Sequence, residues 1–378
     1  MEVEIKEMQS RSKVRISVVG VGGGGCNTIN HIIKHGVDDE IKLISLNTDE
    51  EALGKVSAHS KLKLGEKTTD GLGAGMNPER GRKSAEESYE DIIEEIKGSH
   101  IVLIATGLGG GTGTGASPIV AKAAKEVGAL TIAVVTKPFK HEGALRARIA
   151  EDGLRELRKE VDSFIVIPNE KLRSITDKAL GFKNCLKIVD DVMGQAVKGI
   201  ASFVLNNSGE GINVDFADLN TVMQFKGLGL IGIGEREGED SAVEAVKDAI
   251  ESPLLDNISI NGARGAIVYY ELNEEYPMHK LEEANTIIES AIDTEAFVKF
   301  GYKWNNELNQ THIRVTLVFT GFEKELIQAQ PQEVTQPIPV TTPQLRRLQR
   351  AVGDNGTRNT GVNYDDIDKP IFYREQQD

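Results

Sequence analysis

The segment Ile101-Val-Leu-Ile-Ala-Thr-Gly-Leu-Gly-Gly-Gly-Thr-Gly-Thr-Gly115 is an apolar run that stops in a cluster of glycines and threonines. The apolar part predicts a buried strand over 101–105, and the alanine-rich residues that follow predict a helix near 116–127. Glycines between a strand and a helix let backbone N–H groups point at phosphate oxygens, and the helix N-terminus adds a favourable dipole. We therefore expect a phosphate-binding loop built by Gly109, Gly110, Gly111, Thr112, Gly113, Thr114 and Gly115.

A second glycine-rich loop lies nearer the N-terminus. Val14-Arg-Ile-Ser-Val-Val-Gly-Val-Gly-Gly-Gly-Gly-Cys-Asn27 is again a strand pattern that ends in glycines, and a helical pattern follows it. One glycine cluster alone is as easily a flexible surface loop. Two such loops on two strands of one sheet predict a single nucleotide held from two sides. The second set of contacts is expected at Gly22, Gly23, Gly24, Gly25 and Asn27.

Strand and helix patterns alternate through the first half of the chain. Strands are expected near 14–20, 41–46, 101–105, 130–136 and 164–168, and helices near 27–35, 78–97, 116–127 and 143–160. This alternation predicts an α/β fold with a doubly wound parallel sheet and a ligand at the carboxyl edge of the strands. Asn47 and Asp49 follow the second strand, so we expect them near the ribose or a metal-bound water.

The second half of the chain begins with a long helical pattern. Apolar residues recur at helical spacing from 182 to 205 and predict one largely buried central helix. A polar loop and a short helix near 215–224 follow it. Strands near 227–234, 266–272, 296–303 and 311–320 and helices near 239–251 and 280–290 then predict a smaller C-terminal α/β domain with a mixed sheet. The expected division is a nucleotide-binding domain over 13–181, the central helix over 182–206 and the C-terminal domain over 207–322.

Two adjacent carboxylates, Asp190 and Asp191, interrupt the apolar pattern of the central helix. Guanine presents N1–H and an exocyclic amine, so one carboxylate can accept both donors, whereas N1 of adenine is itself an acceptor and is repelled. A solvated acidic pair is the alternative, but carboxylates among apolar neighbours are costly unless a ligand satisfies them. We expect Asp190 to read guanine, with Asp191 as the second candidate. Asn27 and Asn169 are expected to add hydrogen bonds to the base or sugar.

Composition narrows the classes of function. The 378 residues include 44 basic and 58 acidic side chains, a net charge of −14, which argues against a protein that binds duplex DNA. Two cysteines form no disulfide framework, and the sequence shows no secretion signal. No apolar run approaches the roughly 20 residues of a membrane span. We therefore expect a cytoplasmic protein that does not cross the membrane.

Taken together, the motifs between about Lys13 and Gly321 resemble the tubulin/FtsZ superfamily, and within it the bacterial cell-division GTPases. The segment Gly109-Gly-Gly-Thr-Gly-Thr-Gly115 is similar to the family signature. The resemblance implies that the chain binds GTP and GDP and hydrolyses GTP. It also implies that Mg²⁺ is held through the nucleotide, without a metal ligand from a side chain.

The resemblance assigns further nucleotide contacts. It implies that Gly71, Gly73, Ala74 and Gly75 fold over the γ-phosphate, although these residues alone indicate only a turn. It also implies that Pro138, Glu142 and Arg146 hold the ribose and phosphate side, where Glu142 and Arg146 alone would be a helix ion pair. Many members carry a phenylalanine one helical turn before the guanine-binding residue. Here that position is Leu186, so stacking on the base is reduced to an apolar wall.

Residues for the chemical step are not found beside the glycine loops, and the chain has no Gly-x-x-x-x-Gly-Lys-Ser/Thr loop. By resemblance, Asn213, Asp215 and Asp218 form the loop whose acidic residues reach the nucleotide of the next subunit, although Asp215 and Asp218 also suit a helix N-terminus. A helix of about 24 residues spans roughly 36 Å, so this loop cannot readily reach the phosphates of its own subunit. We expect head-to-tail filaments in which hydrolysis requires assembly.

The two ends of the chain differ from the rest. Residues 1–12 are polar and expected to be disordered, and residues 323–363, rich in Gln, Thr and Pro, are expected to be a disordered linker. In 364–378, Asp368-Lys-Pro-Ile-Phe-Tyr-Arg374 resembles the C-terminal peptide of the family. The resemblance implies that membrane-tethering and regulatory division proteins bind this peptide, and that the chain works at the mid-cell division ring on the inner face of the membrane. The expected partner contacts are Asp368, Pro370, Ile371, Phe372 and Arg374.

Two other classes of function share part of this pattern. An NAD(P)-dependent oxidoreductase also has a strand, a glycine turn and a helix, and Asn47 or Asp49 would suit a ribose contact. That class has no use for the second glycine-threonine loop. A nucleotide sensor that does not assemble, or a cytoskeletal relative without a division role, would keep the pocket and differ in the tail.

Overall fold

The computed structural model describes residues 14–175, 181–205, 216–225, 227–252, 255 and 260–322. The predictions for 1–12, for the linker 323–363 and for the peptide 364–378 lie outside these residues. The strands are β1 Ile16–Val21, β2 Ile41–Asn47, β3 Ser60–Lys63, β4 Ile101–Gly107, β5 Leu130–Lys137, β6 Ser163–Pro168, β7 Gly227–Glu237, β8 Gly265–Leu272, β9 Phe297–Trp304 and β10 His312–Thr320. The helices are α1 Gly22–Lys34, α2 Glu50–Gly54, α3 Glu66–Thr69, α4 Pro78–Glu87, α5 Tyr89–Ile96, α6 Thr112–Glu126, α7 Ala144–Glu160, α8 Asn169–Ile175, α9 Phe182–Leu205, α10 Phe216–Met223, α11 Ser241–Ile250 and α12 Met278–Ala291, with the 3₁₀ turns η1 Lys140–Glu142 and η3 Ile260–Gly262.

Within the described ranges the strands form one ten-stranded sheet in the order β3-β2-β1-β4-β5-β6-β7-β10-β8-β9. Neighbours from β3 to β7 are parallel, β10 is antiparallel to both β7 and β8, and β8 is parallel to β9. The predicted parallel first half and mixed second half are confirmed. The strand order reverses between β1 and β4, and α/β sheets bind ligands beyond the carboxyl ends of the strands at such a switch point.

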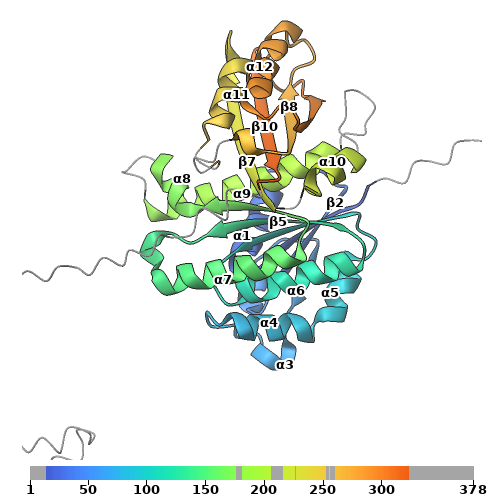
Figure 1. Cartoon of the computed structure of the whole chain (residues 1–378). Coiled ribbons are helices and arrows are strands. Elements are labelled where there is room, and N and C mark those ends of the chain that lie inside the picture. The colour runs from blue at the N-terminus through green and yellow to red at the C-terminus, as the bar shows by residue number, and fades with distance from the viewer. Residues whose placement is uncertain are drawn as a thin grey trace, which may run out of the picture. The chain divides into compact units, whose positions relative to one another are not determined.

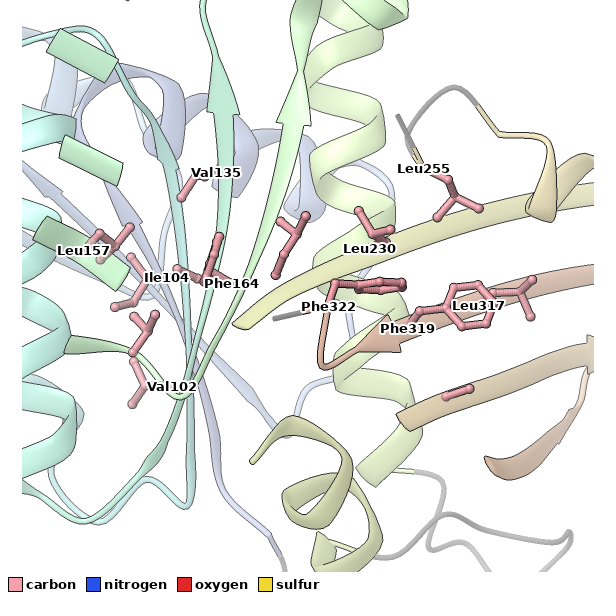
Figure 2. Packing of buried hydrophobic residues seen from close by; sticks show 14 of the residues in the cluster. Val102, Ile104, Val135, Leu157, Phe164, Leu230, Leu255, Leu317, Phe319 and Phe322 are labelled. Atoms are coloured by element: carbon pink, nitrogen blue, oxygen red, sulfur yellow. The ribbon is translucent and has the colours of Figure 1, made fainter. Parts of the chain in front are cut away.

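Helices cover both faces of the sheet (Figure 1). One face buries Ile29 and Ile32 of α1 together with Met193 of α9 and Leu219 of α10. The other face carries α4 to α7 beside the first strands and α11 and α12 beside the last ones. Figure 2 shows this second cluster continuing from Ile104 and Phe164 to Leu230 and Phe319. The parallel and mixed halves of the sheet therefore share a continuous apolar core.

Helix starts differ from the prediction where glycines are concerned. α1 begins at Gly22 rather than near residue 27, and α6 begins at Thr112 rather than near residue 116. The glycine runs thus contribute to the first helical turns. The helix expected over 78–97 is interrupted at Ser88, whose Oγ accepts a hydrogen bond from Gly65 N–H at 3.1 Å. In the part of the chain that the structure describes, no helix is both long and apolar enough to cross a membrane.

Candidate functional site

The two glycine loops lie against each other at the carboxyl ends of β1 and β4. Val21 at the end of β1 is the register partner of Thr106 near the end of β4, and α1 and α6 begin immediately beyond. Gly22 has φ +70°, and a Cβ at this position would lie 2.7 Å from the amide nitrogen of Gly113. That distance is shorter than any real contact of a Cβ. The two helix N-termini are therefore in backbone contact, which only glycine permits.

Open space adjoins two other glycines of the same loops. A Cβ added to Gly23 or to Gly110 would meet no atom within 4 Å. These positions are not needed to pack the protein, so their lack of side chains leaves room for a ligand beside two helix N-termini. A negatively charged group is favoured there by backbone N–H groups and by the helix dipoles.

Threonine hydroxyls connect the loops. Thr112 Oγ1 and Thr48 Oγ1 are 2.6 Å apart, which joins the start of α6 to the end of β2. Thr114 is buried, and its Oγ1 accepts the N–H of Gly109 at 2.8 Å. Thr114 therefore shapes its own loop. Thr48 was not among the residues expected at the site, although it directly follows Asn47 in the sequence.

Residues 71–75 pack beside these loops. The N–H of Gly73 donates to Thr48 O and the N–H of Glu50 donates to Gly71 O, both at 3.0 Å. Ala74 is buried, and a Cβ on Gly111 would lie 2.8 Å from the Ala74 Cβ. The segment predicted from the resemblance to lie over the γ-phosphate is thus tied to the residues that follow β2 and touches the second glycine loop.

Asn47 and Asp49 have local structural roles at the same edge. Asn47 is buried and its Oδ1 accepts the N–H of Thr48 at 2.9 Å. Asp49 caps α2 by accepting the N–H of Ala52 at 2.8 Å. Asp49 also lines a depression of about 270 Å³ together with Gly23 and Asn27. The structure therefore brings Asn27 and Asp49 to one hollow beside the first glycine loop.

Arg146 and Pro138 lie against the second glycine loop. A Cβ on Gly109 would be 2.8 Å from Arg146 Cγ and 3.3 Å from Pro138 Cγ. The Glu142 carboxylate accepts a hydrogen bond from the N–H of Phe139 at 2.8 Å and forms an ion pair with Arg146 Nη1 at 2.7 Å. It therefore orients the guanidinium. Arg146 Nε is buried and has no hydrogen-bond partner among the residues that the structure describes. Glu142 and Arg146 are thus an ion pair that also borders the loop.

Asn169 begins α8 directly after β6. Its side chain is buried, and within the described ranges its Oδ1 has no hydrogen-bond partner. A buried amide oxygen without a partner costs free energy unless a ligand or water satisfies it. Asn169 and Arg146 therefore each present an unused buried polar atom.

Asp190 and Asp191 differ in their surroundings on α9. Asp191 is 3.3 Å from His31 Nε2 and accepts the Gln195 amide at 3.3 Å. Asp190 is half-buried, and among the described residues it has neither a hydrogen bond nor an ion pair. Burial raises the pKa of the Asp190 carboxyl to about 6. The carboxylate that lacks a partner is thus the one that we expected to read guanine.

Asp218 lies at the other end of α9, in the first turn of α10. α9 begins beside α8, which follows the carboxyl end of β6, and it ends beside α10 (Figure 1). Asp218 Oδ1 is 2.9 Å from Lys299 Nζ. Asn213 and Asp215 lie outside the described residues, as do the tail residues Asp368, Pro370, Ile371, Phe372 and Arg374. Within the described ranges, no group of three or more His, Cys, Asp or Glu side chains is arranged to hold a metal ion.

Two family descriptions match this chain. The Tubulin/FtsZ family GTPase domain matches residues 15–177, and the C-terminal domain of the FtsZ family matches residues 227–323. Cell division protein FtsZ from one strain of Helicobacter pylori is 44% identical over 364 residues, which cover 96% of this chain and 93% of the relative. The protein of that name from a second strain is 45% identical over 365 residues, with the same coverage of both chains.

Solved structures agree with these matches. The empty FtsZ dimer of M. jannaschii has a TM-score of 0.77 and 42% identity, covering 82% of this chain and 89% of that one. The GTPgS-bound protofilament of CetZ2 from Haloferax volcanii has a TM-score of 0.67 at 18% identity, covering 82% and 94% of the two chains, and it shares the fold.

Proposed function

The chain belongs to the tubulin/FtsZ family and carries its GTPase domain, and from this premise we propose that it binds GTP where α1 and α6 meet. The phosphates would lie over Gly23 and Gly110, where the structure leaves open space beside two helix N-termini. Residues 71–75 would cover the γ-phosphate. Arg146 would contribute its unused Nε, and Asn169 its unused Oδ1, to the ribose or base side.

Asp190 would select guanine. A half-buried carboxylate that has no partner in the described part of the chain is unfavourable until N1–H and the exocyclic amine of guanine donate to it. Asp191 is engaged by His31 and Gln195, which supports Asp190 over its neighbour. Asn27 and Asp49 line the adjacent hollow and would contact the sugar.

Thr112 and the backbone N–H groups of the glycine loops would hold the phosphates, and Mg²⁺ carried with the nucleotide would supply neutralisation of their negative charge. The residues around the loops fit this arrangement because they offer backbone N–H groups and hydroxyls to the phosphates. The chain's own contribution is to fix the phosphates and exclude bulk water with the loop at 71–75.

Hydrolysis would need a second copy of the chain. The observation that carries this proposal is the placement of Asp218 beyond the far end of α9, a helix of 24 residues. Such a helix spans roughly 36 Å. Asp215 and Asp218 of one subunit would orient the water that attacks the γ-phosphate held by the next subunit. A head-to-tail contact of this kind does not close on itself and produces filaments.

The chain would act in cell division, as the names of its relatives indicate. Filaments in the cytoplasm would form the ring at mid-cell, on the inner face of the membrane. The peptide at 364–378 would hold membrane-tethering and regulatory division proteins, and many weak contacts along one filament would add up through avidity.

Mixed filaments test the shared site. Gly110→Asp places a carboxylate in the open space proposed for the phosphates. It should therefore abolish nucleotide binding at that end of the subunit without disturbing packing. Asp218→Asn removes the catalytic carboxylate at the opposite end of the subunit. Each variant alone should hydrolyse little GTP. An equal mixture should recover up to about a quarter of the unmodified activity, because in one contact out of four a subunit that binds GTP meets a subunit that carries Asp218. Failure of the mixture to exceed both single variants, with both present in the pelleted filaments, would overturn the shared site.

A further inference from the structure

Lys299 lies on the face of the sheet that carries α10. It is the register partner of Ile267 in the parallel β8–β9 pair, so the two side chains point to the same side. Ile267 is buried with Leu219 and Val222 of α10. A lysine at this place therefore extends along the apolar surface toward the start of α10, because its aliphatic stem can follow such a surface while the ammonium stays in water.

The ammonium of Lys299 meets the Asp218 carboxylate at 2.9 Å between Nζ and Oδ1. Asp218 is 23% exposed and Lys299 is 38% exposed. The same Nζ lies 5.6 Å from the centroid of the Phe297 ring, two residues earlier on the same face. Phe297 and Asp218 together limit where the ammonium can go, so the pair is held from both sides.

We propose that Lys299 is a positioning residue that holds the Asp218 carboxylate in the orientation needed at the nucleotide of the next subunit. This inference rests on the proposed shared site. A short aspartate in the first turn of a helix can turn back toward its own backbone N–H groups. The ion pair with the Lys299 ammonium holds the Oδ1 oxygen of this carboxylate toward β9.

A lysine on this strand has a second possible role. β9 is the last strand in the order of the sheet, and lysines on an edge strand discourage pairing with other chains. Lys303 provides the matched comparison, because it lies on the same face of β9 and contacts Glu271 at 3.9 Å rather than Asp218. An edge role predicts similar effects for both lysines, whereas positioning of Asp218 predicts an effect for Lys299 alone.

The first experiment compares Lys299→Met, Lys299→Arg and Lys303→Met in assembled filaments of the full chain. Methionine retains a stem over Phe297 and removes the charge. Lys299→Met should lower kcat roughly threefold to tenfold, since a poorly aligned catalytic group loses rate while a surface ion pair adds little stability. KM for GTP should stay unchanged, because Lys299 lies on the subunit that does not hold the reacting GTP. Lys299→Arg should restore most of the rate, and Lys303→Met should match the unmodified chain.

The second experiment places Lys299→Met on one side of the shared site. In the mixture of Gly110→Asp and Asp218→Asn subunits, the intact Asp218 carboxylate comes from the Gly110→Asp subunit. Lys299→Met in that subunit should lower the recovered activity roughly threefold to tenfold. The same change in the Asp218→Asn subunit should leave the recovered activity as it was. The thermal unfolding of each variant, followed by fluorescence of the single tryptophan, Trp304, checks that all of them fold.

The outcomes separate the two proposals. An unchanged kcat for Lys299→Met, or an equal loss from either subunit, would overturn the role of Lys299 and leave the shared site intact. Full activity of Asp218→Asn by itself would instead remove the shared site, and this result does not involve Lys299. A raised KM for GTP with an unchanged kcat would assign Lys299 to nucleotide binding, and so would also contradict a positioning role.

Discussion

The phosphate side and the base side of the proposed GTP site are built in opposite ways. On the phosphate side, backbone packs on backbone, with Gly22 against Gly113 and Gly111 against Asn77. On the base side, α9 presents side chains with room around them. Asp190 has no partner among the described residues, and Leu186 is 41% exposed. Substitutions on the phosphate side should therefore abolish GTP binding, whereas substitutions on the base side should change the GTP affinity by limited factors.

The largest effect should come from Gly22→Ala. The new Cβ would lie 2.7 Å from the Gly113 nitrogen, at a residue with φ +70°. Unfavourable backbone geometry and overpacking together should lower the free energy of unfolding by roughly 2–4 kcal/mol. GTP binding should fall below detection in calorimetry, because the two helix N-termini must separate.

Gly128→Ala is the matched control for that change. Gly128 has φ +78°, but a Cβ there would meet no atom within 4 Å. It should lose only about 1 kcal/mol of stability and keep GTP binding. Equal losses in the two variants would show that backbone strain, rather than the contact between the loops, makes Gly22 necessary.

The same contrast explains what the sequence could predict. Strand and helix order follow from apolar periodicity, and the glycine loops follow from local composition, so the sheet and its carboxyl edge were predicted. The starts of α1 and α6 were not, because glycine has low helix propensity and the glycine runs indicated loops, whereas in the structure Gly22 packs against Gly113 at the starts of the two helices. The Thr48–Thr112 contact and the Lys299–Asp218 pair join residues far apart in the sequence. No local pattern could indicate them.

The next largest effect is expected from Asp190→Asn. An amide can accept one guanine donor but presents its own N–H₂ to the other, so GTP affinity should fall roughly 10- to 100-fold. Preference for GTP over ATP should fall with it. Asp191→Asn, which removes a charge next to His31 instead, should change GTP affinity less than about threefold. Competition binding with both nucleotides measures these ratios, and a stronger effect at Asp191 would reverse the assignment.

The Asp190 carboxyl also predicts a pH dependence. Burial raises its pKa from 3.8 to about 6, so the folded chain binds more protons than the unfolded chain between these values. Without nucleotide, this group's contribution to stability therefore declines as the pH rises through that window and stays low above it. Asp190→Asn should be more stable than the unmodified chain at pH 7, with the difference shrinking as the pH falls toward 4. Denaturant unfolding at several pH values gives the comparison, and a difference independent of pH would contradict it.

The smallest change is expected at Leu186, where the base side should gain rather than lose. Leu186 lies one helical turn before Asp190 and is exposed, so a larger side chain meets no packed core. An aromatic ring there could stack on guanine, and aromatic contacts of this kind contribute about 0.5–1.5 kcal/mol beyond buried area. Leu186→Phe should therefore tighten GTP and GDP binding roughly twofold to tenfold. Leu186→Ala should weaken both by a smaller factor, and equal affinity of all three chains would show that the base does not lie against this face of α9.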